Sequence, residues 1–155
     1  MEDSLKWCAG LKDGLRINEP DERLANVYLN EAKSSLRRAE KNLADGDLLW
    51  ATVVIYYAEY YALYSFLQKI GVKCENHFCS ILAVERLAGT QRTNVIKQHK
   101  GKRLDAQYYM RIGKEEQVKS MLREAKIFIS DFDTFVSNLT NDEILEYGKK
   151  IKALT

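Results

Sequence analysis

The sequence contains few of the residues that interrupt helices. Proline occurs once in the 155 residues, at Pro20, and most of the eight glycines separate segments of helical periodicity. No segment alternates apolar and polar residues convincingly at a period of two, which argues against a sheet. A chain so poor in breakers, and rich in Leu, Ala, Lys and Glu, predicts an all-α fold.

The sequence also predicts neither a targeting segment nor a membrane-spanning segment. The N-terminal residues show no basic stretch followed by an apolar one, so no signal peptide is expected. The longest apolar run, 48–67, is interrupted by Glu59 and carries several hydroxyl groups that would need partners in lipid. We interpret this run as a buried core helix. The odd number of cysteines, three, predicts free thiols and a cytoplasmic location.

The phosphate-binding fingerprints of nucleotide-dependent enzymes do not occur. The sequence has no GxxxxGK[ST] loop and no GxGxxG after a strand. It also lacks the GxSxG pattern of a nucleophile elbow. Nothing therefore indicates a nucleotide-hydrolysing or dinucleotide-dependent enzyme, and no cofactor is expected.

Apolar periodicity places the predicted helices. They are a short one near 5–11, a long one that starts after residue 18 or 19 with Pro20 near its first position and runs to 44, and then 47–70, 77–87, 114–139 and 141–154. The stretch 89–101 is less defined: 93–99 favours a short helix, Gly101 a break, and 102–112 a helical turn that Gly113 stops. Asn76 is a candidate cap, and Thr140 with Glu143 forms a capping-box pattern.

These segments predict one domain over residues 1–155. We expect an up-and-down bundle of four main helices with short extra helices. Its core would cover about 20–139, and 141–154 would be an accessory helix.

The net charge of +2 is unevenly distributed along the chain. The segment 86–111 holds seven basic residues against one acidic residue, so it carries +6 and the rest of the chain −4. A local positive field attracts phosphate, although a solvated loop face has the same composition. The basic residues are Arg86, Arg92, Lys97, Lys100, Lys102, Arg103 and Arg111.

Two further clusters each have a structural alternative. A compact C-x2-H-x-C cluster contains Cys74, His77 and Cys79; the spacing matches no standard zinc knuckle, so no metal is expected, and the alternative is a free-thiol loop with a capping histidine. The rings of an aromatic run are more often core or interface residues than base-stacking ones. This run contains Tyr56, Tyr57, Tyr60, Tyr61, Tyr64 and Phe66.

Several stretches together resemble the archaeal and bacterial HEPN domains. They are, in order, Asn30–Ala39, Gly46, Ala51–Ala58, Gly71 with His77, and the motif Arg103-Leu-Asp-Ala-Gln-Tyr108. The last is similar to the arginine motif of one HEPN branch, in which a tyrosine lies five residues after the arginine. The resemblance spans about 29–136, and it depends on the order and spacing of motifs that are individually short.

The resemblance implies a helical bundle that forms a homodimer and gathers basic residues in a cleft at the dimer axis. Many HEPN proteins are metal-independent ribonucleases, often toxins neutralised by a nucleotidyltransferase encoded alongside. Their usual signature is Arg-x4–6-His: the arginine holds the scissile phosphate, and the histidine moves the proton of the 2′-hydroxyl. RNA or a nucleotide, and a nucleotidyltransferase partner, are thus implied.

The sequence departs from that signature at the histidine. The matching position is Tyr108, and a tyrosine, whose ordinary pKa is about 10, is a poor general base but can hydrogen-bond a phosphate. A second candidate pair, Arg92 and His99, has Arg-x6-His spacing and lies upstream of the family position. For Arg103 the alternative is a salt bridge with Asp105 or a glutamate of the long helix. The surrounding positive field would come from Lys97, Lys100, Lys102 and Arg92.

The sequence is compatible with two functions. The first is a protein that acts on RNA, or binds a nucleotide or phosphate, in a basic cleft across a homodimer, with metal-independent cleavage if it is an enzyme. The second is a catalytically inactive interaction module that binds a nucleotidyltransferase or another protein. The tyrosine at the histidine position favours the second.

Overall fold

The computed structural model describes the backbone of residues 2–155 and the side chains of residues 4–155. Its elements are α1 (Glu2–Gly10), β1 (Arg16–Ile17), α2 (Glu22–Ala44), α3 (Leu48–Ile70), β2 (Val72–Lys73), α4 (His77–Ala88), the short 3-10 helix η1 (Thr90–Arg92), α5 (Asn94–Tyr109), α6 (Glu115–Ser137) and α7 (Asn141–Leu154). The predicted all-α class is confirmed, because β1 and β2 are two residues long and are the only strands in the described residues.

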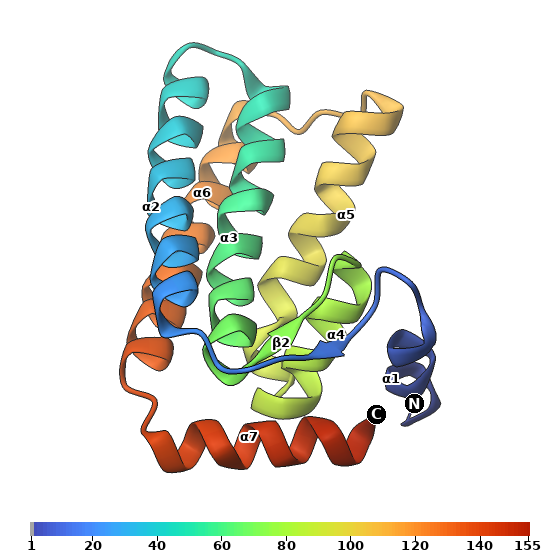
Figure 1. The fold of residues 1–155 in the computed structure, drawn as a ribbon. Helices are drawn as coiled ribbons and strands as arrows, with labels where there is room; N and C mark the ends of the chain where they lie inside the picture. Colours follow the sequence, from blue (N-terminus) through green and yellow to red (C-terminus); the bar gives the residue numbers. More distant parts are fainter. Residues whose placement is uncertain (1) are drawn as a thin grey trace.

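Helix α3 lies at the centre of the fold. It contacts α2, α4, α5, α6 and α7, and almost every residue in its second half is buried. Figure 1 shows α2, α3, α5 and α6 lengthwise beside one another, α7 across one end, and the chain termini close together at that end. The buried core helix predicted at 48–67 is confirmed. None of the helices described is both long and apolar enough to cross a bilayer.

Side-chain caps set several helix starts. The Thr140 and Glu143 capping box is present at α7, and the Asn76 side chain accepts a hydrogen bond from the Cys79 N–H, so both predicted caps are confirmed. The predicted place of Pro20 was wrong. Asp21 is the N-cap of α2, because its carboxylate accepts from the Leu24 N–H at 2.8 Å, and Pro20 therefore lies before the helix.

The two short strands pair at the end of the α2–α3 hairpin opposite its connecting loop. Arg16 pairs with Lys73 and Ile17 with Val72 in an antiparallel register. Gly71 makes this possible: its φ is +85°, and a Cβ there would lie 2.4 Å from the Asn18 carbonyl oxygen. Only glycine combines that backbone conformation with so close an approach.

Helix α5 is continuous where the sequence predicts an interruption. It runs from Asn94 to Tyr109 through Gly101. Glycine costs about 1 kcal/mol in a helix interior, and here burial against α3 outweighs that cost. The buried positions on both sides of Gly101, which recur at helical spacing, are Ile96, His99, Arg103 and Ala106. The helix ends at Met110, which has a positive φ of 53°, and not at Gly113.

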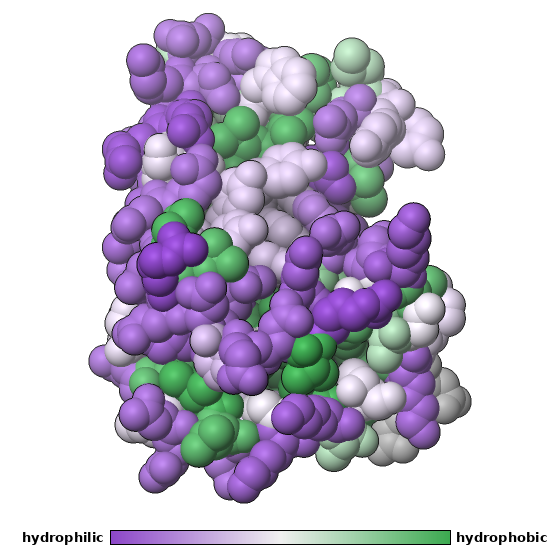
Figure 2. Space-filling view, viewed as in Figure 1, coloured by the Kyte–Doolittle hydropathy of each residue, from purple (hydrophilic) through white to green (hydrophobic). Residues whose placement is uncertain are grey.

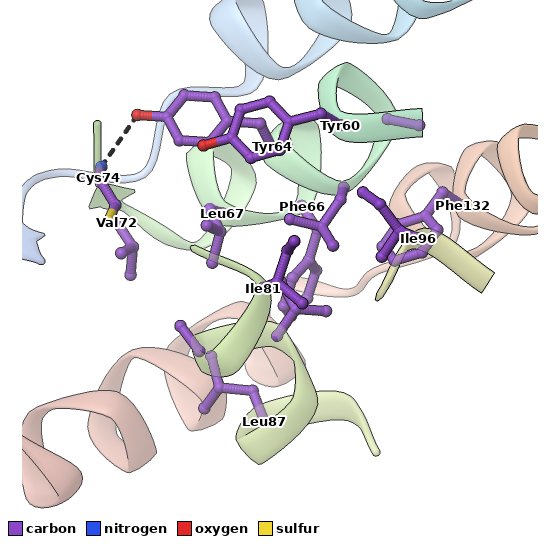
Figure 3. Close-up of a cluster of buried hydrophobic side chains, with 14 of the residues drawn as sticks. Tyr60, Tyr64, Phe66, Leu67, Val72, Cys74, Ile81, Leu87, Ile96 and Phe132 are labelled. Atoms are coloured by element: carbon purple, nitrogen blue, oxygen red, sulfur yellow. Dashed lines mark hydrogen bonds between the residues drawn. The ribbon is translucent and has the colours of Figure 1, made fainter. Parts of the chain in front are cut away.

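The cysteines differ from the prediction of free thiols. Cys8 of α1 and Cys79 of α4 form a disulfide, with their Cα atoms 5.7 Å apart, whereas Cys74 is a free, buried thiol. The prediction failed because 71 residues separate the pair in sequence and only the packing of α1 on α4 brings them together. Figure 3 shows the adjacent core, in which the Cys74 N–H donates to the Tyr64 hydroxyl at 3.0 Å.

Candidate functional site

Arg103 lies on α5 and points toward α3 instead of into solvent. It is 7% exposed, and its guanidinium carbon lies 4.7 Å from the ring centre of Tyr56 and 5.5 Å from that of Tyr57. The negative faces of the rings hold the cation there. Nη1 donates to the Gln107 side-chain oxygen at 3.1 Å, but the buried Nε has no acceptor in the described part of the chain. A buried N–H without an acceptor is costly, so Arg103 is our first candidate for a ligand-binding residue.

His77, the first residue of α4, lies against the same aromatic cluster. Its Nδ1 is 2.9 Å from the Tyr56 hydroxyl, and its ring stacks on Tyr60 with the ring centres 3.8 Å apart. Burial lowers the pKa of His77 to about 4, helped by the positive charges of Arg103 and Lys100. The imidazole is therefore neutral at neutral pH and has a nitrogen lone pair that can accept a proton.

Lys100 completes a group of three nitrogen-bearing side chains. It lies on α5 one turn before Arg103, is partly buried, and places its ammonium 5.7 Å from the Phe78 ring centre. Burial lowers the pKa of Lys100, and the positive charge of Arg103 lowers it further. Neither cation forms an ion pair with a carboxylate among residues 4–155. Two partly desolvated cations without a counterion favour an anionic ligand.

Tyrosine rings form the surface next to these cations. Tyr57 and Tyr61 are half-buried on α3, and Tyr28 of α2 lies 5.9 Å from Tyr61, ring centre to ring centre. Figure 2 shows pale side chains of intermediate hydropathy over the middle of this face, with strongly hydrophilic ones on both sides. Partly exposed aromatic rings beside cations are a combination that single-stranded nucleic acids bind.

The structure does not bring Tyr108 to Arg103. Five residues rotate an α-helix by about 500°, so the two side chains leave α5 on different faces. Tyr108 is 64% exposed, whereas Arg103 is buried on α3. The salt bridge considered for Arg103 is not formed either, because its side-chain partner is Gln107 and not Asp105.

Arg92 and His99 also lie apart. The guanidinium of Arg92, in η1, sits 3.7 Å from the ring centre of Phe135 on α6. His99 is buried, and its Nδ1 lies 2.9 Å from both carboxylate oxygens of Glu59. The spacing that suggested this pair therefore reflects two separate packing roles.

Among the three lysines expected to supply the positive field, only Lys100 lies beside Arg103. Lys97 forms an ion pair with Glu85 of α4, which neutralises its charge. Lys102 is exposed and lines a different small cavity together with Asp105 and Arg111. The basic segment is thus divided among several surfaces, and a compact cation group remains at Lys100 and Arg103.

Glu59 and His99 form a buried polar pair behind the site. Glu59 lies one turn after Tyr56 on α3, and the pair links α3 to α5 next to Arg103. Burial raises the pKa of Glu59 to about 7, and the hydrogen bond from His99 opposes that rise. The other ring nitrogen of His99 is 3.7 Å from Glu124 on α6. This pair fixes the position of α5 on α3 and has no access to a ligand.

Sequence reasoning missed His77 as a partner of Arg103. It appeared in the cluster with Cys74 and Cys79, but Cys79 is bonded to Cys8 and is not available as a thiolate ligand. His77 precedes Arg103 by 26 residues, outside any local Arg-x-His spacing. The only sequence signal was its place after Gly71 in the HEPN resemblance.

We compared the chain with family models, with curated proteins and with solved structures, and none of these comparisons finds a match.

Proposed function

We propose that the chain is a HEPN-like four-helix bundle that binds RNA at a phosphodiester group and cleaves it without a metal ion. Arg103 and Lys100 would hold the phosphate, and His77 would transfer the proton. The observation that carries the proposal is the buried guanidinium of Arg103 beside Lys100 and neutral His77. Within residues 4–155, the Nε of Arg103 has no acceptor and neither cation is paired with a carboxylate.

Phosphate binding follows from the donors at the site. A guanidinium presents N–H groups in a fixed fork that matches phosphate oxygens, and an ammonium adds a point charge. The tyrosine rings on which Arg103 rests restrict its rotation, so little side-chain entropy remains to be lost on binding. A bound anion would also stabilise the imidazolium form and raise the pKa of His77 from its value of about 4.

The proposed cleavage uses the same three side chains. When the Nδ1–H of His77 donates to the Tyr56 oxygen, the second ring nitrogen accepts the 2′-hydroxyl proton while the 2′-oxygen bonds to phosphorus. The bond from phosphorus to the 5′-oxygen breaks, and this oxygen takes a proton from Lys100, whose lowered pKa makes it a better acid. The products are a 2′,3′-cyclic phosphate and a 5′-hydroxyl. Exchange with water then removes the proton from His77 and returns one to Lys100.

The test is incubation of single-stranded RNA with the purified chain in EDTA. We expect fragments with cyclic-phosphate ends from the unmodified chain and none from Arg103→Ala or His77→Asn. Asparagine keeps a group that can hydrogen-bond Tyr56 but no base. Arg123→Ala, which removes an exposed arginine of α6, is the matched control and should cleave normally. Equal cleavage by all four proteins would overturn the proposal.

A second candidate function is supported by a different surface. The end of α5 and the residues that follow it expose a group of large apolar side chains, which is uncommon on a free surface and typical of protein interfaces. The group contains Tyr108, Tyr109, Met110 and Ile112. In this alternative the chain is an inactive module that binds a nucleotidyltransferase or another protein.

Assembly distinguishes the two candidates. The ribonuclease proposal includes a homodimer whose axis passes near Arg103, whereas the module would bind its partner through the end of α5. Light scattering of the unmodified chain and of Tyr109→Glu measures the oligomeric state of each. A dimer unaffected by Tyr109→Glu supports the first candidate, and a monomer that cleaves no RNA supports the second.

A further inference from the structure

A cavity of about 340 Å³ lies between α4 and α5, next to the first residues of α1. Its apolar wall comes from α4: Phe78 is 50% exposed, Leu82 is half-buried and Ile81 is buried. Lys97 and Lys100 of α5 form the opposite side. These helices lie side by side near the chain termini in Figure 1. A half-exposed ring over an apolar wall offers a stacking surface for a flat ligand.

The cavity shares Lys100 with the proposed phosphate site. Phe78 follows His77 in the first turn of α4, and the Lys100 ammonium lies near the Phe78 ring while its charge also acts on His77. One ligand can therefore place an anionic group at Arg103 and Lys100 and a ring over Phe78. In RNA, a base and its own phosphate are separated by a single sugar, which suits this arrangement.

Glu85 gives the cavity a hydrogen-bond acceptor. One carboxylate oxygen accepts from the Thr93 hydroxyl at 2.9 Å and from Lys97, whereas the other oxygen has no partner among the described residues. The hydrogen bond from Lys97 lowers the pKa of Glu85, with a smaller contribution from Thr93, so the group is ionised at neutral pH. The oxygen without a donor can accept from an amino group, but it has no hydrogen to offer a carbonyl oxygen.

We propose that this cavity receives the nucleobase next to the bound phosphate, stacked on Phe78, and that Glu85 selects bases with an amino group over uracil. This inference rests on the proposed function, because it needs the phosphate at Arg103 to position the base. Cytosine and uracil test it most sharply, since they have rings of the same size and differ in an amino group against a carbonyl oxygen.

The experiment measures the binding of fluorescently labelled short oligo(C) and oligo(U) by anisotropy, with His77→Asn present in every protein to prevent cleavage. We expect oligo(C) to bind roughly tenfold more tightly than oligo(U). Glu85→Gln should remove this difference, because a carboxamide both donates and accepts. Phe78→Leu should weaken both ligands, whereas Trp50→Leu, which changes an equally exposed ring in the first turn of α3 outside the cavity, should weaken neither.

The outcomes separate this inference from the proposed function. Equal binding of oligo(C) and oligo(U), or a preference that survives Glu85→Gln, overturns the base site even if Arg103→Ala abolishes the binding of both. If Arg103→Ala leaves both affinities unchanged, the phosphate site itself is overturned. Phe78→Leu could lose binding because the protein is destabilised, which a lowered melting temperature would reveal. Phe78→Tyr, which keeps an aromatic ring, is the control for that case. It must bind with the affinity of the unmodified ring for the inference to hold.

Discussion

The guanidinium of Arg103 rests on the ring of Tyr56, 4.7 Å from its centre, while the hydroxyl of the same tyrosine lies 2.9 Å from Nδ1 of His77. One tyrosine of α3 therefore positions a cation from α5 and an imidazole from α4. Burial raises the pKa of Tyr56, so its hydroxyl stays protonated and uncharged beside the imidazole. Arg103 and Tyr56 form the centre of the candidate site.

Arg103→Leu should separate stability from binding. The arginine is buried and its Nε has no acceptor among the described residues, so leucine removes a desolvation cost while keeping part of the apolar contact with the tyrosine rings. We expect a melting temperature equal to or above that of the unmodified chain, and an RNA affinity at least about tenfold lower. Thermal melting and anisotropy measure the two quantities. A destabilised variant with normal affinity would assign Arg103 to the fold alone.

Salt dependence counts the cations that contact phosphate. For single strands, the slope of log affinity against log salt changes by about 0.7 for each phosphate contact. Lys100→Ala should reduce the magnitude of the slope by about this amount. Lys126→Ala is the control, because Lys126 is already paired with Glu40 at 3.1 Å, and its slope should equal that of the unmodified chain. Equal slopes for all three proteins would show that Lys100 does not contact the RNA phosphates.

Glu59→Gln should change the pH dependence of stability. The pKa of Glu59 rises from its ordinary value of 4.5 to about 7 in the folded chain. The contribution of this group to stability is therefore complete below pH 4.5 and is lost as the pH rises through 7. Denaturation at several pH values should show the unfolding free energy of Glu59→Gln rising relative to the unmodified chain across this window, by up to roughly 3 kcal/mol. A difference that does not vary with pH would contradict the assignment.

The disulfide between Cys8 and Cys79 should contribute measurably to stability. It closes a loop across 71 residues, and the chain-entropy model gives about 4 kcal/mol for a loop of this size. Reductant should lower the unfolding midpoint of the unmodified chain and leave that of the Cys8→Ser, Cys79→Ser double variant unchanged. Thiol titration of the unfolded, unreduced chain should detect Cys74 alone. Reaction of all three cysteines would show that the bond does not form.

Local patterns predicted most of the helices, because each depends on neighbours in sequence. The Thr140 and Glu143 capping box and the Asn76 cap are formed as expected. The break expected at Gly101 fails for a tertiary reason: the residues around it bury one face of α5 on α3, and that burial exceeds the helix cost of one glycine. The sequence of this segment shows the glycine, but it does not show that the segment packs against α3.

The candidate site was only partly accessible to sequence reasoning. Arg103 and Lys100 lie on one helix face three residues apart, so the basic segment and the HEPN resemblance led to both. His77 comes from α4 and Tyr56 from α3, and no spacing rule connects them to Arg103. Tyr108 was chosen because of its sequence distance, and the rotation of α5 places it on another face.

The most direct test of the proposed phosphodiester site is the NMR signal of the Arg103 Nε–H, assigned by its loss in Arg103→Lys. Titration of His77→Asn protein with oligo(C) should shift this signal with the same saturation curve as the anisotropy, because the buried Nε gains a phosphate oxygen as acceptor. The Nε–H of Arg123 should not move. If RNA binding saturates while the Arg103 signal stays in place, the phosphate binds elsewhere and the account is wrong.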